Sequence, residues 1–293
     1  MVEHSYTIAN FGILPYLNAL IFKRITAWGV SFVVGGLALS LHDAVHMQTL
    51  LLLAAITLNY WVGFTLNDYY DMPYDVMDRH KAQGNIFIRD NRFRHYFILL
   101  IALVSVYSLL VFASFGWSGI LILLLGYFGM WAYSAPPLRL KSIPGLDVMV
   151  HACFVQSFPY WVCMTLIGAE WIILDYIILT VNILCSIAGQ LYQQLRDFEV
   201  DRNTSTNLTI WIGTRKASLI LKSVYANALI VVLVGLLLGV IPLFLIPVLL
   251  LAAPVLLHRL VHSPIGRDQT TIRVGIYGIT LMAIGYTCFL LIV

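Results

Sequence analysis

The sequence predicts an all-α membrane protein, a bundle of nine transmembrane helices. Of its 293 residues, 60% are hydrophobic and only 11% are charged, whereas about a quarter of the residues in a soluble domain are charged. The apolar residues form long unbroken runs, each near the roughly 20 residues that a helix needs to cross a bilayer. A membrane β-barrel would instead show short segments of alternating hydrophobicity.

We expect a single integral-membrane domain over residues 1–293. Its predicted spans are residues 25–42, 47–66, 95–114, 118–134, 145–167, 171–195, 216–239, 241–261 and 271–292. The segment 11–24 is too short to cross and ends in two basic residues, which favours an interfacial helix. That helix would place Asn18 and Arg24 at the mouth of the bundle.

The basic residues predict the orientation. All 17 Lys and Arg fall before the first span, in alternate loops or just inside the span ends beside those loops, and therefore on one face of the predicted bundle. Positively charged loops stay in the cytoplasm, so we expect a cell-membrane protein with a cytoplasmic N-terminus and a C-terminus on the opposite side. The net charge of +3 restates this bias and gives no reason to expect nucleic acid as a partner.

A cluster of acidic residues directly follows the second span, in residues 67–78. Asn67, Asp71 and Asp75 are four residues apart, so on a helix they would form one stripe. Like charges at this spacing repel, and a bound divalent cation would reverse that repulsion. Pro73 can kink or end a helix, so the place of Asp75 in the stripe depends on the helix continuing past it.

The same amide–acid–acid spacing recurs in residues 193–201, as Gln193, Asp197 and Asp201. Both copies lie at the cytoplasmic end of an even-numbered span, which indicates two pseudo-repeated halves. Facing helices in a bundle can build a metal site from such carboxylates.

Basic residues follow the second and fourth predicted spans, which both end on this face. Arg79 and Lys81 lie in a loop, residues 78–94, for which we expect no regular structure, and Arg139 and Lys141 follow the fourth span. Oxygen ligands without His or Cys favour Mg²⁺ or Ca²⁺ over zinc, and Mg²⁺ is commonly shared between carboxylates and substrate phosphates. Acids, cations and apolar helices together predict an isoprenyl diphosphate such as geranyl or geranylgeranyl diphosphate as ligand.

The motifs at 67–75, at 133–141 (Tyr-Ser-Ala-Pro-Pro-Leu-Arg-Leu-Lys) and at 197–201 together resemble the UbiA-type intramembrane prenyltransferases. The resemblance implies a central cavity with cytoplasmic cap loops and Mg²⁺ as cofactor. It implies Mg²⁺ ligands at Asn67, Asp71, Asp75, Asp197 and Asp201. With the residue analysis above, it predicts substrate-binding residues Asn18, Arg24, Arg79, Lys81, Arg139 and Lys141, and catalytic residues Asp68, Asp71, Tyr133 and Asp197.

The implied reaction transfers the prenyl chain to a lipophilic or aromatic acceptor within the membrane. The C1–O bond of the donor breaks with allylic cation character, which the face of Tyr133 can stabilise. Among the acceptors of similar members, an aromatic quinone precursor is favoured here, with an archaeal glycerolipid, a carotenoid or chlorophyllide as alternatives.

Two other classes of protein use carboxylates at a membrane. A cation transporter would hold its acids near mid-span, whereas these clusters lie at helix ends. A CDP-alcohol phosphotransferase would need one contiguous acidic motif rather than two separate ones.

Asp147 and His151, at the start of the fifth predicted span, are also four residues apart. We expect these two side chains to pair with each other, with a role in shaping a pocket as the alternative.

Overall fold

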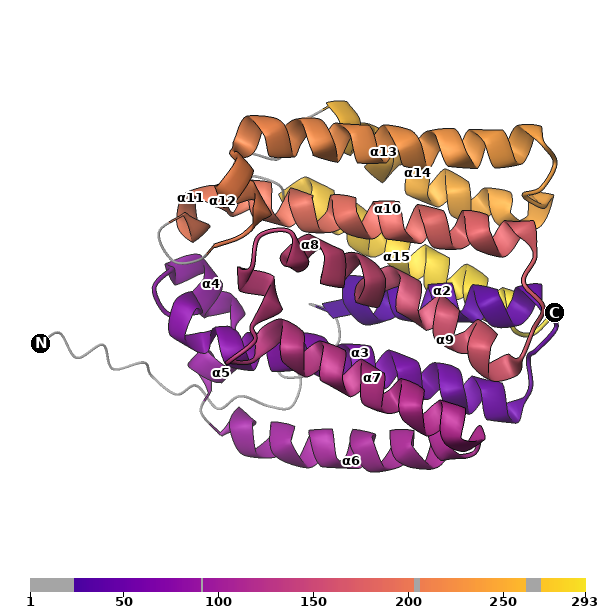
Figure 1. The fold of residues 1–293 in the computed structure, drawn as a ribbon, viewed down its shortest axis with the longest axis horizontal. Coiled ribbons are helices and arrows are strands. Elements are labelled where there is room, and N and C mark those ends of the chain that lie inside the picture. The colour runs from indigo at the N-terminus through magenta and orange to yellow at the C-terminus, as the bar shows by residue number, and fades with distance from the viewer. Residues whose placement is uncertain (1–23, 91, 203–205, 262–269) are drawn as a thin grey trace, which may run out of the picture.

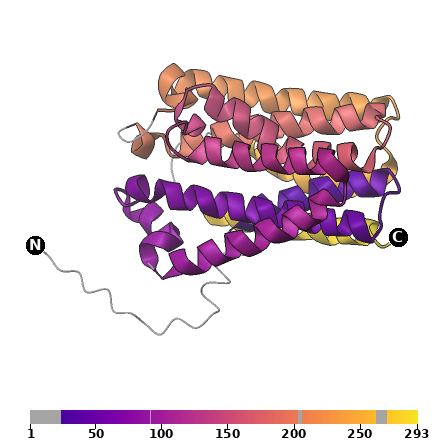
Figure 2. The same ribbon diagram turned by 60° about the horizontal axis from the view of Figure 1, so that its bottom comes forward.

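The computed structural model describes residues 24–90, 92–202, 206–261 and 270–293. Every regular element in this part of the chain is helical, which confirms the predicted all-α class. Figures 1 and 2 show the long helices running side by side. They are α2 (Ile25–Leu41), α3 (Met47–Asp75), α6 (Phe93–Ala113), α7 (Gly116–Ser134), α9 (Phe158–Ile167), α10 (Ile173–Arg196), α13 (Thr214–Leu237), α14 (Ile246–Val261) and α15 (Thr270–Leu290).

Short helices connect them. These are α4 (Arg79–Gly84), α5 (Ile86–Arg89), η2 (Leu140–Ser142), α8 (Leu146–His151), η3 (Ala152–Ser157), α11 (Phe198–Asp201), α12 (Leu208–Ile212) and η4 (Leu243–Leu245). The elements α8, η3 and α9 follow one another without a break, and η3 is a π-helical turn.

Seven of the described helices are long and apolar enough to cross a membrane, as expected of a multi-pass membrane protein. The first and last of the nine predicted spans correspond to two shorter apolar helices, Ile25–Leu41 and Gly275–Leu290. The described outer surface is apolar as well: Leu110 and Leu237, for example, are 69% and 86% exposed. Helices in lipid require such faces.

The motif-bearing helices α3 and α10 each pack against several other helices. α3 packs against α2, α6, α7 and α9, while α10 packs against α8, η3 and α13. One buried cluster, around Leu52 and Tyr160, joins α2, α3, α6, α7 and α9, and a second, around Leu191 and Leu221, joins α10 and α13.

Helix α3 brings the first acidic motif out of the apolar part of the bundle. Its 29 residues are about nine more than a span needs, and the surplus carries residues 67–75. Pro73 lies inside α3 and does not end it. Because Pro73 is in the last turn, only one ladder hydrogen bond is lost, and Asp75 stays on the helix.

The loop 78–94 is more ordered than expected, because it contains α4 and α5. Asp78 caps α4 by accepting the amide of Lys81 (2.9 Å), and Asn85 caps α5 by accepting that of Phe87 (3.1 Å). Both are preferred capping residues. The prediction of irregular structure here was therefore wrong.

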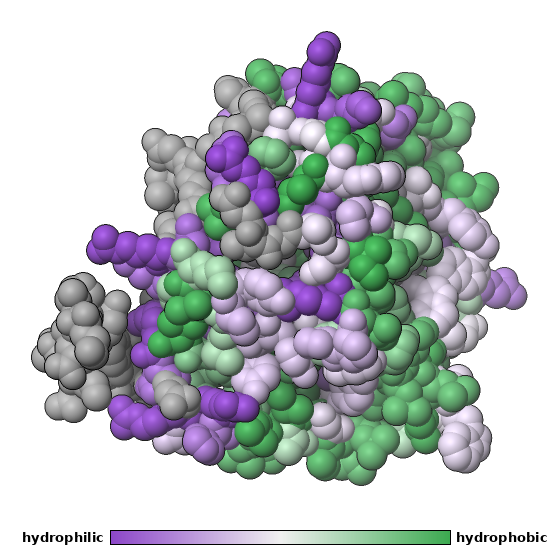
Figure 3. Space-filling view, turned by 60° about the vertical axis from the view of Figure 1, so that its left-hand side comes forward, coloured by the Kyte–Doolittle hydropathy of each residue, from purple (hydrophilic) through white to green (hydrophobic). Residues whose placement is uncertain are grey.

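These short helices lie at one end of the molecule together with α11 and α12, and the C-terminus lies at the other end (Figure 1). Hydrophilic side chains gather over the first end, while apolar side chains dominate the adjoining flank (Figure 3).

Near the opposite end, a buried carboxylate joins three segments. Asp175 is fully buried and accepts hydrogen bonds from the Tyr160 hydroxyl (2.5 Å) and the backbone amide of Ile172 (2.7 Å), and its Oδ1 lies 2.9 Å from His42 Nε2. These contacts tie the start of α10 to α9 and to the end of α2.

Replacing Asp175 by alanine is expected to lower the free energy of unfolding by about 3 kcal/mol, because Tyr160 and His42 lose their buried partner. Unfolding in mixed detergent micelles measures this. The matched control is Glu170→Ala, which removes an exposed acid from the same connection. Equal stability of the two variants would contradict the structural role given to Asp175.

Candidate active site

The first motif presents Asn67 and Asp71 on one face of α3. The Asn67 amide donates to Asp71 Oδ2 (3.0 Å), and Asn67 Oδ1 accepts the Ser134 hydroxyl from the end of α7 (3.0 Å). The spacing of one helical turn allows the first contact, and the packing of α3 on α7 supplies the second. These contacts therefore hold the Asn67 amide oxygen and the Asp71 carboxylate in fixed positions.

Two cations from the segment after α7 converge on the same acid. Lys141 Nζ lies 2.6 Å from Asn67 Oδ1 and 2.6 Å from Asp71 Oδ1, and Arg139 Nη2 lies 2.8 Å from Asp71 Oδ1. Arg139 adopts a left-handed backbone conformation (φ 37°), which is unfavourable for a side chain of its size. Burial lowers the pKa of Lys141, which means that burial disfavours the charged form of its ammonium group. A second anion beside Lys141 would stabilise that charged form.

The second motif lies at the junction of α10 and α11. Asp197 pairs with Arg196 (2.7 Å), and Asp201 pairs with Lys81 of α4 (2.5 Å). Burial raises the pKa of Asp201, and the charges of Asp197 and Asp71 act in the same direction despite the Lys81 partner. The two acidic motifs therefore share one electrostatic environment.

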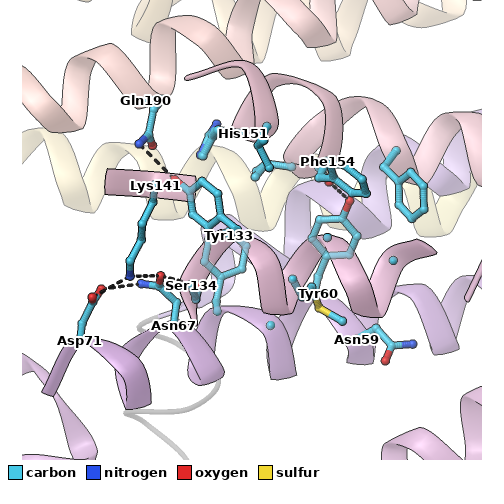
Figure 4. Close-up of a pocket in the computed structure, with 18 of the residues that line it drawn as sticks. Asn59, Tyr60, Asn67, Asp71, Tyr133, Ser134, Lys141, His151, Phe154 and Gln190 are labelled. Atoms are coloured by element: carbon cyan, nitrogen blue, oxygen red, sulfur yellow. Dashed lines mark hydrogen bonds and ion pairs between the residues drawn. The ribbon is translucent and has the colours of Figure 1, made fainter. Parts of the chain in front are cut away.

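A cavity of about 360 Å³ connects these groups. Its polar end is lined by Arg24, Asn67, Asp71, Asp75, Lys81, Arg139, Lys141, Gln193, Asp197 and Asp201. Much of the remaining wall is aromatic, with Tyr60, Phe64, Phe112, Phe154 and Phe158. Figure 4 shows Asp71, Asn67 and Lys141 together on one side and Tyr60 with Phe154 on another.

The predicted catalytic and substrate-binding residues do not all line the cavity. Asp68 is not among the cavity-lining residues and pairs with Arg24, which does line the cavity. Arg79 is exposed and outside the lining set, whereas Asn18 lies outside the described residues. Tyr133 lines the cavity and accepts a hydrogen bond from Gln190 of α10 (3.2 Å).

Asp147 and His151 do not pair with each other, contrary to our expectation. Asp147 accepts from Gln194 Nε2 (2.6 Å) and from the backbone amides of Gly145 and Leu208 (2.7 and 2.8 Å). His151 instead contacts Ser186 and lines the cavity. Helix-face spacing does not reveal contacts with α10, so the sequence could not predict these partners.

Asn85 is a site residue that sequence reasoning treated only as part of a turn. It is buried, and its amide donates to Asp75 Oδ2 (2.9 Å) and to the Asp68 carbonyl (2.7 Å). The side chain thereby ties the loop after α3 to the acidic motif. A Gly-Asn pair in the sequence marks a turn but says nothing about these bonds.

Replacing Asn85 by alanine is expected to raise the Mg²⁺ concentration needed for half-maximal activity by about tenfold, a typical effect of losing a group that orients a metal ligand. A magnesium titration of the expected activity measures the change. Asn227→Ala, an exposed substitution on α13, is the control. An unchanged magnesium requirement in the Asn85 variant would refute the positioning role.

No three His, Cys, Asp or Glu side chains in the described part of the chain gather closely enough to hold a metal ion by themselves. The cavity end does offer carboxylate and amide oxygens from two motifs, in separate groups. This donor chemistry suits Mg²⁺, which is usually bound by one or two carboxylates and completed by substrate phosphates.

The model of the UbiA prenyltransferase family matches residues 29–289. The chain belongs to this family. The enzyme class expected from the sequence, a prenyltransferase, is thereby confirmed for this UbiA family member, and neither the transporter nor the phosphotransferase alternative is supported.

Solved structures share the fold of this UbiA family member. A UbiA homologue from Archaeoglobus fulgidus bound to GPP and Mg²⁺ gives a TM-score of 0.68 at 19% identity, covering 95% of this chain and 99% of that one. A UbiA homologue from the same organism bound to DMAPP and Mg²⁺ gives 0.67 at 20% identity over the same shares. A digeranylgeranylglyceryl phosphate synthase gives 0.54 at 14%, covering 96% and 97%. No curated protein matches significantly.

Proposed function

We propose that this enzyme transfers an isoprenyl chain from a prenyl diphosphate to a lipophilic or aromatic acceptor, with Mg²⁺ as cofactor. The observation that carries the proposal is the cavity itself. Both acidic motifs and four cations, Arg24, Lys81, Arg139 and Lys141, line one end of it, and aromatic side chains line much of the rest. A molecule with a charged diphosphate and a hydrocarbon tail matches that division. Solved family members bound to GPP or DMAPP with Mg²⁺ support the same ligand class.

The Mg²⁺ ligands in this proposal are the oxygens of Asn67, Asp71, Asp75, Asp197 and Asp201. Each motif contributes few ligands, which leaves coordination positions for the diphosphate, as Mg²⁺ sites in phosphate-binding enzymes commonly do. Bound there, Mg²⁺ would offset the negative charge that develops on the leaving diphosphate.

Side chains of the protein bind the diphosphate and shield the allylic cation in this proposal. Arg139 and Lys141, now paired with Asp71, supply donors for the diphosphate oxygens, as Arg24 and Lys81 would from other sides of the cavity end. Charge-assisted bonds of this kind are short and strong. The aromatic walls exclude water from an allylic cation, and the face of Tyr133 can stabilise that cation.

We further propose that this end of the bundle faces the cytoplasm, that nine helices span the membrane, and that the cavity lies at the centre of two pseudo-repeated halves. Positively charged side chains on α4 and α5, which lie at one end of the molecule, support the orientation. An aromatic quinone precursor is the proposed acceptor, on the motif resemblance alone.

The test is direct. Purified enzyme is incubated with Mg²⁺, geranylgeranyl diphosphate and a panel of aromatic and aliphatic acceptors, and both diphosphate release and product mass are measured. We expect Mg²⁺-dependent diphosphate release together with a product one prenyl group heavier than an acceptor. No release under any condition would overturn the proposed function, as would full release from Asp71→Ala and Asp197→Ala variants.

A further inference from the structure

A second group of polar side chains lines the cavity, apart from the metal motifs. Gln190 of α10, His151 at the end of α8 and Tyr133 of α7 come from three different helices, and each lines the same cavity. Gln190 and His151 are each only 9% exposed. In Figure 4, Tyr133 lies between the Asn67–Lys141 pair on one side and Gln190 on the other, with His151 beside Gln190.

The hydrogen bonds of His151 define which ring nitrogen can accept a proton. Ser186 Oγ lies 3.0 Å from His151 Nδ1 and donates to the His151 carbonyl (2.8 Å). A hydroxyl has one proton, and Ser186 uses it on the carbonyl. Nδ1 of the neutral ring must therefore carry the ring proton and donate to Ser186, which leaves the lone pair on Nε2.

No described side chain bonds to Nε2, and the ring faces the cavity. Gln190 and Tyr133 also have polar atoms that no described side chain contacts. Gln190 donates through Nε2 to Tyr133, which leaves Gln190 Oε1 and the Tyr133 hydroxyl proton without a partner among the described residues. Buried polar groups of this kind are normally satisfied, so the cavity wall offers two acceptors and one donor to a ligand.

The backbone next to His151 also departs from regular structure. The π-helical turn η3 begins at Ala152, directly after His151. Such turns are rare and frequently occur at functional sites. The Tyr60 hydroxyl donates to the Phe154 carbonyl within this turn, so the widened turn is held against α3 and shapes the same cavity.

We propose that His151 is the general base of the reaction and that the acceptor carries a hydroxyl group that hydrogen-bonds to His151 Nε2. The inference rests on the proposed prenyl transfer. The hydroxyl proton passes to Nε2 while the nucleophilic atom of the acceptor bonds to C1 of the prenyl chain. The C1–O bond breaks, and its electron pair leaves with the diphosphate.

The same chemistry serves an aliphatic alcohol, which bonds through its oxygen, and a phenol, which can bond through oxygen or a ring carbon. When a ring carbon bonds, its proton returns to the oxygen and restores the aromatic ring, so one proton is released in every case. Gln190 Oε1 and the Tyr133 hydroxyl would hold a second polar group of the acceptor and orient it.

The experiment compares His151→Gln with the unaltered enzyme on phenols and fluorinated alcohols of graded acidity. Glutamine retains a hydrogen-bonding group but cannot take the proton. With weakly acidic acceptors, we expect transfer to fall on the order of 100-fold, within the range typical of general bases. With acceptors that are already ionised at the assay pH, the deficit should disappear, because no base is then needed.

Binding of geranylgeranyl diphosphate with Mg²⁺ is measured on both proteins and should be unchanged, which separates a lost base from a misfolded site. His95→Gln is the matched control, since His95 is exposed on α6 outside the cavity. The inference would be overturned if the deficit of the His151→Gln variant were equal at every acceptor acidity, or if this variant transferred the prenyl group at the full rate. Transfer by the unaltered enzyme to acceptors without a hydroxyl group would overturn it as well. If the unaltered enzyme transfers no prenyl group to any acceptor, it is the proposed function that fails.

Discussion

Replacing Asp71 by asparagine is expected to slow Mg²⁺-dependent prenyl transfer by on the order of 100- to 1000-fold, similar to the loss of one electrostatic group that stabilises a transition state. Asp71 lines the cavity and contacts Asn67, Arg139 and Lys141. Asparagine has nearly the same shape but no charge, so the proposed metal ligand is lost and two cations lose their carboxylate partner. Single-turnover diphosphate release measures the effect.

Asp43→Asn is the control for this prediction. Asp43 is exposed and has a positive φ of 49°, a conformation that asparagine also tolerates. The substitution therefore removes one acid without a change in backbone preference. If the Asp71 variant lost no more activity than this control, the proposed role of Asp71 as a metal ligand would be wrong.

Replacing Lys141 by glutamine is expected to raise the KM for the prenyl diphosphate by roughly 10- to 100-fold, because a hydrogen bond to a charged group contributes about 1.5–3 kcal/mol. In the proposed function, Nζ would move from its contacts with Asn67 and Asp71 (2.6 Å each) to the diphosphate. Equilibrium binding of the diphosphate, measured beside steady-state kinetics, shows whether affinity is lost.

Lys222→Gln serves as the comparison, since Lys222 is exposed on α13 and outside the cavity. It removes the same charge from the protein without touching the site. Should both variants bind the diphosphate equally well, Lys141 would be a partner of Asp71 only, and its proposed substrate contact would be wrong.

The sequence predicted the helices well where composition alone decides. Long apolar runs require helices in lipid because backbone groups must pair within the segment, and each predicted span corresponds to a described helix. The helix ends were harder to place. α3 continues through Pro73 to Asp75, and caps at Asp78 and Asn85 order the loop that follows. These outcomes depend on local hydrogen bonds that spacing does not reveal.

At the candidate site, many of the residues named from the sequence line the cavity, but most of their partners were not foreseen. The contacts of Arg139 and Lys141 with Asp71 agree with the motifs. Three contacts were not predictable: Lys81 reaches Asp201, Asn85 reaches Asp75, and His151 reaches Ser186. The first and the last join segments far apart in the chain, which only the packing of α4 and α8 on their neighbours brings together. The contact of Asn85 with Asp75 depends on the path of the chain between these two residues, which spacing does not reveal.

The central claim is that the two acidic motifs hold one metal–diphosphate complex between them. Its most direct measurement is Mn²⁺ binding, followed by electron paramagnetic resonance, with and without a non-reactive prenyl thiodiphosphate. We predict that the analogue strengthens Mn²⁺ binding and that Asp71→Asn and Asp201→Asn each abolish this gain. If the analogue still strengthens Mn²⁺ binding in either variant as much as in the unaltered enzyme, the two motifs do not share the complex.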